Sequence, residues 1–339
     1  MLMRGGTSKG ACFLAGDLPA DPGARDDLLL RLLGSPDPRQ VDGIGGGHPL
    51  TSKVAVVSRS ERTDADVDYL FLQVQVDRAV VAAGQPCGNI LAAVGPYALE
   101  RGLIPGGAKE TTVRIHMVNT GALAEARFAT PGGLPCYDGD TMIDGVPFPA
   151  APVHIVFEGT EGSVCGALLP TGRPLDTVDG VEVGCVDNGM PVVVLAAGDV
   201  GVTGYESPEE LEANQKLRDR VERLRLAAGQ LMGLGDVTDQ TVPKMTLVSP
   251  PRDGGTLSTR TFIPHRCHTS IGVLGAVSVA TAVGLPDSPA ARVAGAPGPG
   301  GRIRIEHPTG FFDTEPVGGR IAVLRTARKL FDGTAFPRS

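Results

Sequence analysis

Residues 270–285 read SIGVLGAVSVATAVGL, a run without a charged side chain in which hydroxyls are the polar groups. A second run, residues 87–99 with the sequence CGNILAAVGPYAL, also lacks charge. A helix that is apolar on every side must be enclosed on every side. The two runs therefore predict two helices, one beginning near Cys87 and one near Thr269, each surrounded by a sheet.

Two details refine this prediction. The pair Gly95 and Pro96 predicts a kink or break in the first helix, because proline has no N–H to donate and its ring crowds the preceding turn. In the second helix Gly272, Ala276 and Ala280 are spaced four apart. Such small residues predict that surrounding backbone approaches closely there.

Short segments rich in β-branched and aromatic residues predict the strands of the two sheets. They are residues 53–58, 69–76, 112–119, 153–158, 192–197, 245–249 and 303–307. Two further helices are expected. One spans residues 24–33 and is stopped by Gly34, and the other is a charged surface helix that opens with a capping box at residues 207–210 and runs to about Leu226.

The order of these features repeats along the chain. In each half a Gly-rich turn, a strand beginning with lysine and an apolar helix follow one another, and residues 53–58 (KVAVVS) align with residues 244–249 (KMTLVS). The shared order predicts an α/β (α+β) chain of two similar domains, residues 1–170 and 171–339. The identity is slight, so chance similarity is the alternative.

Composition excludes several classes of protein. The 339 residues include 47 Gly, 28 Pro and no Trp, yet 42% hydrophobic content and a mean hydropathy of +0.06 indicate a packed globule. The net charge of −7 comes without a basic patch or aromatic platforms, so no nucleic-acid partner is expected. The longest apolar run has about 15 residues, too few to span a bilayer.

The six cysteines and the chain start indicate a compartment. None of the cysteines forms a C-x-x-C pair, which suits a reducing cytosol better than a disulfide framework. The first residues, MLMRGG, contain no hydrophobic signal core. We therefore expect a cytoplasmic protein that has neither a nucleic acid nor a membrane as its partner.

Cys87 and Lys53 are the residues most suggestive of chemistry. A thiol at the start of a buried helix meets free N–H groups and the positive end of the dipole, which favour the thiolate. Lysine is scarce here, with six residues, and Lys53 opens an apolar strand where partial desolvation would make it a usable base. The alternatives are a packed core cysteine and a lysine that reaches out to water.

Polar clusters elsewhere indicate ligand contacts rather than a nucleotide or metal site. Residues 4–10 (RGGTSKG) form a plausible carboxylate cradle without the Walker A order, and residues 43–48 (GIGGGH) depart from the dinucleotide fingerprint. His265, Cys267 and His268 are too closely spaced for the usual zinc patterns, so we expect no metal. We expect residues 265–268, Thr269 and Ser270 to contact substrate instead.

Four segments together resemble the PrpF family of the diaminopimelate-epimerase-like superfamily: residues 3–10 (MRGGTSKG), 42–47 (DGIGGG), 50–53 (LTSK) and 87–89 (CGN). Five more resemble the branch of that family that acts on 4-oxalomesaconate: residues 34–40 (GSPDPRQ), 116–121 (HMVNTG), 137–140 (YDGD), 187–191 (DNGMP) and 263–268 (IPHRCH). The resemblance covers nearly the whole chain. The 2-methylaconitate cis–trans isomerases share the first group of motifs.

The resemblance implies two epimerase-like domains, each a β-barrel-like sheet around a central helix, with the active site in the cleft between them. It implies a cofactor-independent isomerase of aromatic acid (gallate or protocatechuate) degradation that acts on a small tricarboxylate, with a homodimer as a family-level expectation. Lys53 and Cys87 match the family's catalytic positions. The second half carries Thr269 where two-thiol epimerases carry a second cysteine, which favours Lys/Cys catalysis.

The residues expected to bind substrate lie around these two. They are Arg4, Thr7, Ser8, Gly88, Asn89, Asn119, Lys244, His268, Thr269 and Ser270. Relatives have a short strand before the Met3–Gly6 motif, and this chain begins two residues ahead of it, so we expect the first sheet to lack a strand. The remaining alternatives are aconitate-type isomerisation, a catalytically silent tricarboxylate-binding protein, and a cysteine hydrolase that pairs Cys87 with His268.

Overall fold

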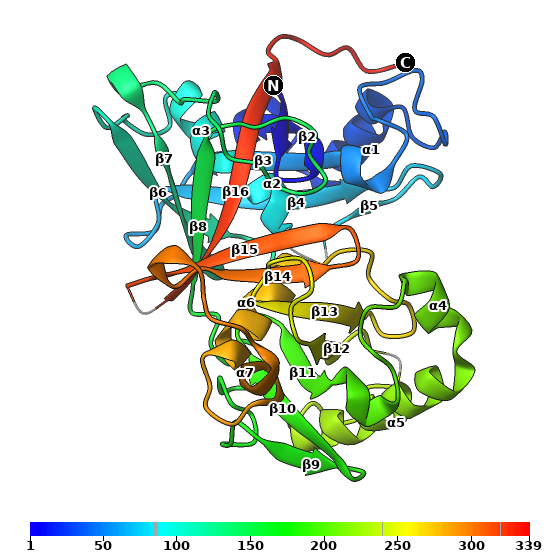
Figure 1. Cartoon of the computed structure of the whole chain (residues 1–339). Helices are drawn as coiled ribbons and strands as arrows, with labels where there is room; N and C mark the ends of the chain where they lie inside the picture. Colours follow the sequence, from blue (N-terminus) through cyan, green and yellow to red (C-terminus); the bar gives the residue numbers. More distant parts are fainter. Residues whose placement is uncertain (84–86, 239, 319) are drawn as a thin grey trace. The chain divides into compact units, whose positions relative to one another are not determined.

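The computed structural model describes residues 1–83, 87–238, 240–318 and 320–339, which form two compact units (Figure 1). The first unit is Met1–Glu158 with Leu324–Ser339, and the second is Gly159–Val323. The predicted division at residues 170 and 171 differs from this, and the C-terminal segment belongs to the first unit. The reason is a strand pairing between the two ends of the chain.

The sheet of the first unit is a closed ring of eight strands. In spatial order these are β1 (Leu2–Gly5), β2 (Ser8–Leu14), β3 (Lys53–Arg59), β4 (Val67–Val74), β6 (Glu110–Met117), β7 (Ala122–Ala129), β8 (Pro152–Glu158) and β16 (Arg320–Phe331). The pairing of β1 with β16 closes the ring, and the short β5 (Val81–Ala82) pairs with β4. β1 thus has a strand on each side, so the expectation of a missing strand is wrong.

The strand that begins with Lys53 is buried on both faces. Val54 and Val56 pack against Leu29 and Leu33 of helix α1 (Pro22–Leu33), while α3 (Val94–Glu100) also contacts β3. A strand with helices on two sides is expected to be apolar throughout. The predicted helix 24–33 is confirmed, with Gly34 in the left-handed conformation at its end.

The first apolar run forms the predicted central helix, in two pieces. α2 (Gly88–Leu91) contacts β1, β2 and β3, and α3 contacts β3, β6 and β7, so strands of one ring surround both pieces (Figure 1). The break lies at Ala92–Ala93, ahead of the predicted Gly95 and Pro96. Pro96 cannot donate to the carbonyl four residues earlier, on Ala92, so the helix is interrupted one turn before the proline.

The second unit repeats the strand pattern of the first. Its strands are, in spatial order, β9 (Asp176–Val178), β10 (Val181–Asp187), β11 (Pro191–Ala196), β12 (Lys244–Ser249), β13 (Leu257–Phe262), β14 (Ile303–His307), β15 (Gly310–Val317) and β16. From β1 to β8 neighbouring strands pair antiparallel, parallel, antiparallel, parallel, antiparallel and antiparallel. The order from β10 to β16 is the same. The predicted internal repeat is confirmed.

The second apolar run forms the central helix of this repeat, α6 (Val273–Val283), which contacts β10, β11, β14 and β15. It begins at Val273 and not near Thr269, because Thr269 and Ser270 lie in a bend, where the N–H of Ser270 donates to His268 Nδ1, and the N-cap Gly272 has extended backbone. A methyl group on Gly272 would meet no atom within 4 Å, so the close approach predicted there is wrong. α7 (Pro289–Val293) follows α6 and packs against it.

The predicted charged helix is two helices, α4 (Pro208–Ala213) and α5 (Gln215–Leu231). The capping box of Ser207 and Glu210 opens α4 as predicted. Asn214 between them has a non-helical ψ of 89°, and its side chain accepts a hydrogen bond from the N–H of Leu217. Asn214 therefore ends one helix and caps the next, which a reading of charge alone does not reveal.

In the described part of the chain, no helix has the length and apolar character needed to cross a membrane.

Candidate functional site

The turn between β1 and β2 packs directly against the start of α2. Gly6 has φ of +52°, and a methyl group on it would lie 2.3 Å from Asn89 Oδ1. A methyl group on Gly5 would lie 2.6 Å from the carbonyl oxygen of Asn89. Glycine is therefore needed at both positions. Both residues approach Asn89 too closely for a side chain, and Gly6 also has a left-handed backbone conformation. The turn of the Gly-rich motif and the segment that begins at Cys87 therefore lie against each other.

Two buried oxygen atoms at this contact lack partners among the described residues. They are Ser8 Oγ and Asn89 Oδ1, and Ser8 is 1% exposed. A buried polar atom without a hydrogen bond is unfavourable and marks a place for a ligand or a bound water. Ser8 and Asn89 are therefore well placed to contact a polar ligand.

Lys53 is the first residue of β3 and is 7% exposed. Its Nζ donates a hydrogen bond of 2.8 Å to Gln73 Oε1 and lies 5.1 Å from the centre of the Phe71 ring. A methyl group on Gly10, its neighbour on β2, would lie 2.6 Å from the carbonyl oxygen of Lys53. The predicted desolvation of Lys53 is confirmed, and the alternative of a lysine that reaches out to water is wrong.

Cys87 is the residue at the N-terminal end of α2 and has a free, partly exposed thiol. Tyr69 Oη donates a 3.4 Å hydrogen bond to its carbonyl oxygen. Because α2 contacts β1, β2 and β3, the segments that carry Ser8, Lys53 and Cys87 lie side by side. α2 has four residues, so its dipole is smaller than that of the single long helix predicted from the sequence. Pro86 lies outside the described residues.

The guanidinium of Arg4 is hydrogen-bonded within the protein and stabilises the turn. Its Nη1 donates to the carbonyl oxygen of Gly6 at 2.9 Å, and to the carbonyl oxygen and hydroxyl of Thr326 at 3.1 and 2.9 Å. Burial lowers the pKa of its guanidinium, and the charge of Arg328 lowers that pKa further. Thr7, the next predicted contact, is partly exposed in the turn that Arg4 supports.

Asn119 has a supporting role that corrects its predicted one. Its side-chain amide donates to the carbonyl oxygens of Phe71 at 2.9 Å and Ala83 at 2.8 Å, and its Oδ1 accepts from the N–H of Phe71 at 2.8 Å. Both amide hydrogens are used by backbone, so neither is left to donate to a substrate. Asn119 instead fixes β4 and the chain that leads toward Cys87.

The second unit brings together the other predicted residues. Lys244 opens β12, and burial lowers its pKa, as does the charge of Arg225. His268 Nδ1 accepts a 2.9 Å hydrogen bond from the N–H of Ser270. Burial lowers the pKa of His268, and the charge of Lys244 lowers it further. His268 and Ser270 precede α6 as the Cys87 segment precedes α2, whereas Lys244 has the position of Lys53.

His307 and Thr309 belong to this cluster and were not predicted from the sequence. Thr309 Oγ1 donates to the carbonyl oxygen of Thr269 at 2.9 Å. The N–H of Thr309 faces His307 Nδ1 at 3.3 Å, so His307 carries its proton on Nε2, which lies 3.1 Å from Ser270 Oγ. The Ser270 hydroxyl is then able to donate to a ligand. Asn119 and Thr309 each bind the chain that leads into a central helix, and they follow corresponding strands of the repeat, β6 and β14. An alignment of the two halves at these strands could have pointed to Thr309.

His268 gives the second unit an expected dependence on pH. Its pKa lies below the ordinary value of 6.5. As the pH falls below about 6.5, the unfolded chain binds a proton that the folded chain does not, so the free energy of unfolding decreases. Urea unfolding at several pH values is expected to show a shallower decrease for His268→Gln than for the natural protein. The exposed His265→Gln is the control, and equal slopes for His268→Gln and the natural protein would contradict the assignment.

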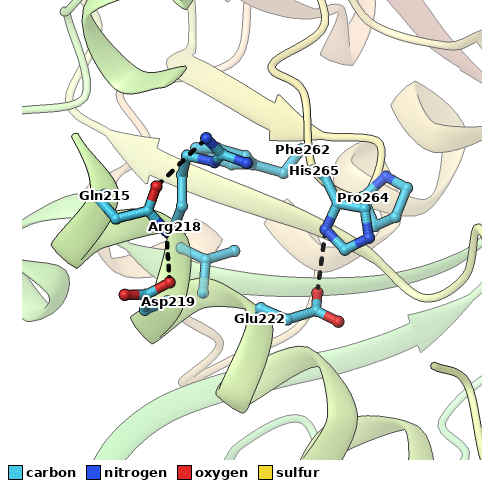
Figure 2. Close-up of a pocket in the computed structure, with 8 residues that line it drawn as sticks. Gln215, Arg218, Asp219, Glu222, Phe262, Pro264 and His265 are labelled. Carbon is cyan, nitrogen blue, oxygen red and sulfur yellow. Dashed lines mark hydrogen bonds and ion pairs between the residues drawn. The ribbon is translucent and has the colours of Figure 1, made fainter. Parts of the chain in front are cut away.

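The cluster of His265, Cys267 and His268 does not converge on one point. His265 Nδ1 lies 3.8 Å from Glu222 on α5, whereas His268 faces Ser270. Burial raises the pKa of the Cys267 thiol to about 11, so it carries its proton at neutral pH. Figure 2 shows His265 in a shallow pocket of about 100 Å³ against α5, which includes none of the predicted site residues.

The family model described as "PrpF protein" matches residues 1–337. The chain belongs to the PrpF family. Its fold is the one that the sequence predicts, and a hydroxyproline epimerase from Agrobacterium vitis shares it, with a TM-score of 0.50 at 16% identity over 99% of this chain and 93% of that one.

Three similar PrpF relatives carry informative names. The (4E)-oxalomesaconate Δ-isomerase of Novosphingobium is 59% identical over 99% of this chain and 96% of its own. The 4-oxalomesaconate tautomerase of Pseudomonas putida is 57% identical over 98% of this chain and 94% of its own. The crystal structure of a methylitaconate Δ-isomerase has a TM-score of 0.90 and 33% identity, and covers 98% of this chain and 93% of that one.

Proposed function

We propose that this PrpF protein is an isomerase that moves a proton on 4-oxalomesaconate, with Lys53 and Cys87 as its catalytic residues. One observation carries the proposal: a buried lysine with a neutral partner lies on a strand beside the helix that begins at a free cysteine. The relatives at 57–59% identity whose names refer to 4-oxalomesaconate support the choice of substrate.

The reaction needs one group to take a proton and one to return it. Removal of a carbon-bound proton α or vinylogous to the ketone gives a dienolate, whose charge spreads to the ketone oxygen. A proton returned to that oxygen completes a keto–enol tautomerisation, and one returned to the far carbon completes an allylic shift. In either case the proton count is unchanged, and Lys53 and Cys87 supply the acid and the base.

The negative charge of the substrate and dienolate requires hydrogen-bond donors. Ser8 Oγ is buried without a partner beside the turn, so it can donate to a carboxylate at little reorganisation. The first N–H groups of α2, on Gly88 and Asn89, have no partner within the helix itself. We assign Ser8, Gly88 and Asn89 to the substrate.

Other parts of the proposal stay predictions. These are the contacts of Lys244, His268, Thr269 and Ser270 with substrate, the location of the site in a cleft, independence from a cofactor, a homodimer, a cytoplasmic location, and a role in gallate or protocatechuate degradation. The order in which Lys53 and Cys87 act also stays open.

A substrate panel tests the proposal. We expect the purified protein to convert 4-oxalomesaconate, followed by ultraviolet absorbance, with a kcat/KM at least about tenfold above that for 2-methylaconitate or trans-aconitate. Preference for either of the latter would replace the proposed substrate with the aconitate-type alternative. Binding of 4-oxalomesaconate in a calorimeter without any turnover would instead establish a tricarboxylate-binding protein.

A further inference from the structure

Gln73 lies directly opposite Lys53 in the register of β3 and β4. Its Oε1 accepts the 2.8 Å hydrogen bond from Lys53 Nζ. Within residues 1–83 and the other described segments, this is the one hydrogen bond that Nζ makes. The position of the lysine nitrogen therefore depends on the position of one amide oxygen.

Backbone groups fix the orientation of that amide. Gln73 Nε2 donates to the carbonyl oxygens of Pro49 and Ser52, both at 3.1 Å, and of Val74 at 3.3 Å. A flipped amide would turn its oxygen toward three carbonyl oxygens and its NH₂ group toward an ammonium, and both contacts are repulsive. Gln73 can thus present only its oxygen to Lys53.

The charge around Lys53 makes the chemical type of this partner important. In the described part of the chain, no carboxylate lies within 4.0 Å of Nζ. Titratable groups are present on every element packed against β3. They are Lys9 and Cys12 on β2, Asp17 in the turn after β2, Arg25, Asp26, Asp27 and Arg31 on α1, His48 ahead of the turn that leads into β3, Asp68 and Tyr69 on β4, Cys87 at α2, and Tyr97 and Glu100 on α3. The ammonium is held by a neutral oxygen and by the face of the Phe71 ring, without an anion that would fix its proton.

We propose that Gln73 is a positioning residue that fixes Lys53 Nζ and, because its oxygen is neutral, does so without an anion that would hold Lys53 in its charged form. This inference rests on the proposed role of Lys53 in proton transfer. A glutamate in the same place would keep an acceptor for Nζ, while its second oxygen would face the carbonyl oxygens that Gln73 Nε2 now binds. Its charge would stabilise the ammonium, since an opposite charge at this distance favours the charged form.

Two substitutions separate this role from a structural one. Gln73→Glu is expected to move the pH–rate profile upward by about 1–3 pH units. Gln73→Leu keeps the bulk but removes the acceptor, so burial without a partner moves the profile downward by about one unit. Both variants lose the three bonds to backbone carbonyls, so a merely structural role would affect them alike. The limb that moves also identifies the role of Lys53: the acid limb if it is the base, and the alkaline limb if it is the acid.

The protonation of Lys53 can be followed without any substrate. The chain has six lysines, so a carbon-13 NMR titration of protein labelled at lysine Cε gives few signals, and the signal lost in Lys53→Met is that of Lys53. We expect its titration midpoint to rise in Gln73→Glu, to fall in Gln73→Leu, and to stay unchanged in Gln75→Glu, which adds a carboxylate two residues along the same chain segment.

The outcomes are distinguishable from a failure of the proposed function. Midpoints that do not move, or that move in the same direction in both Gln73 variants, would overturn the inference whatever the enzyme turns over. Midpoints that move in opposite directions in a protein inactive on 4-oxalomesaconate would support the role of Gln73 and reject the proposed substrate. Circular dichroism of each variant confirms that it is folded at the pH of measurement.

Discussion

Lys53→Met is expected to lower the turnover of 4-oxalomesaconate by about 10²–10⁴-fold, which is the usual contribution of a positioned acid or base. Lys53 is 7% exposed, and its hydrogen-bond partner Gln73 cannot transfer the proton in its place. Methionine has a similar length and no titratable group, so the substitution removes the proton transfer while the space stays filled.

The fold should tolerate this change. Removal of the ammonium ends the cost of burying a charge, whereas the Gln73 oxygen loses its donor, so the two effects on stability oppose each other. We therefore expect the thermal unfolding midpoint to stay within a few degrees of that of the natural protein. Lys109→Met is the control, because Lys109 is exposed in the same unit. Turnover by Lys53→Met equal to that of the control would exclude Lys53 from the chemistry.

Cys87→Ala is expected to cause a loss of the same order, about 10²–10⁴-fold in kcat, with a smaller change in substrate affinity. The thiol is free and lies at the start of α2, next to the turn that carries Ser8. The N–H groups proposed to hold substrate belong to Gly88 and Asn89, and the substitution leaves them in place. A loss confined to KM would make Cys87 a binding residue.

Cys136→Ala is the matched control for this variant. Cys136 is a free, partly exposed thiol in the same unit, and its Sγ donates to the carbonyl oxygen of Asp138 at 3.2 Å. Its removal should leave kcat within about twofold. Equal activity of Cys87→Ala and Cys136→Ala would contradict the two-residue mechanism.

The features that could be predicted from sequence are those that depend on local pattern. Two uncharged runs with apolar residues on every side predicted two enclosed helices, and α3 and α6 are buried on nearly all sides. The recurrence of a lysine at the start of an apolar strand located β3 and β12 and the internal repeat. Lys53 could be predicted to be desolvated because the residues after it are apolar on both faces of the strand.

The features that could not be predicted depend on contacts between distant segments. β16 completes the ring of the first unit because it pairs with β1 at the other end of the chain, so the domain boundary was misplaced. Asn119 belongs to a recognisable motif, but its bonds to Phe71 and Ala83 exist only once β4 and β6 lie side by side. The contact of His307 with Ser270 likewise joins residues far apart in the chain.

Helix ends were missed for a different reason. Asn214 ends α4 and caps α5 through its own side chain, which competes with the helical backbone for hydrogen bonds. The N–H of Ser270 is bound by His268 Nδ1 in a bend, so α6 begins only after it. In both places a polar side chain overrides the helical tendency of its neighbours.

The central claim is that Lys53 and Cys87 move a carbon-bound proton of 4-oxalomesaconate, and turnover in D₂O with NMR mapping of substrate and product tests it most directly. With the natural enzyme at equilibrium in D₂O, we expect deuterium at one defined carbon, in the product of an allylic shift or in the ketone of a keto–enol pair. We further expect that one variant, Lys53→Met or Cys87→Ala, still exchanges the substrate proton without forming product, and that the other does neither. No exchange with solvent at any carbon of either molecule after equilibrium is reached, or deuterium incorporated equally by both variants and the natural enzyme, would contradict this mechanism.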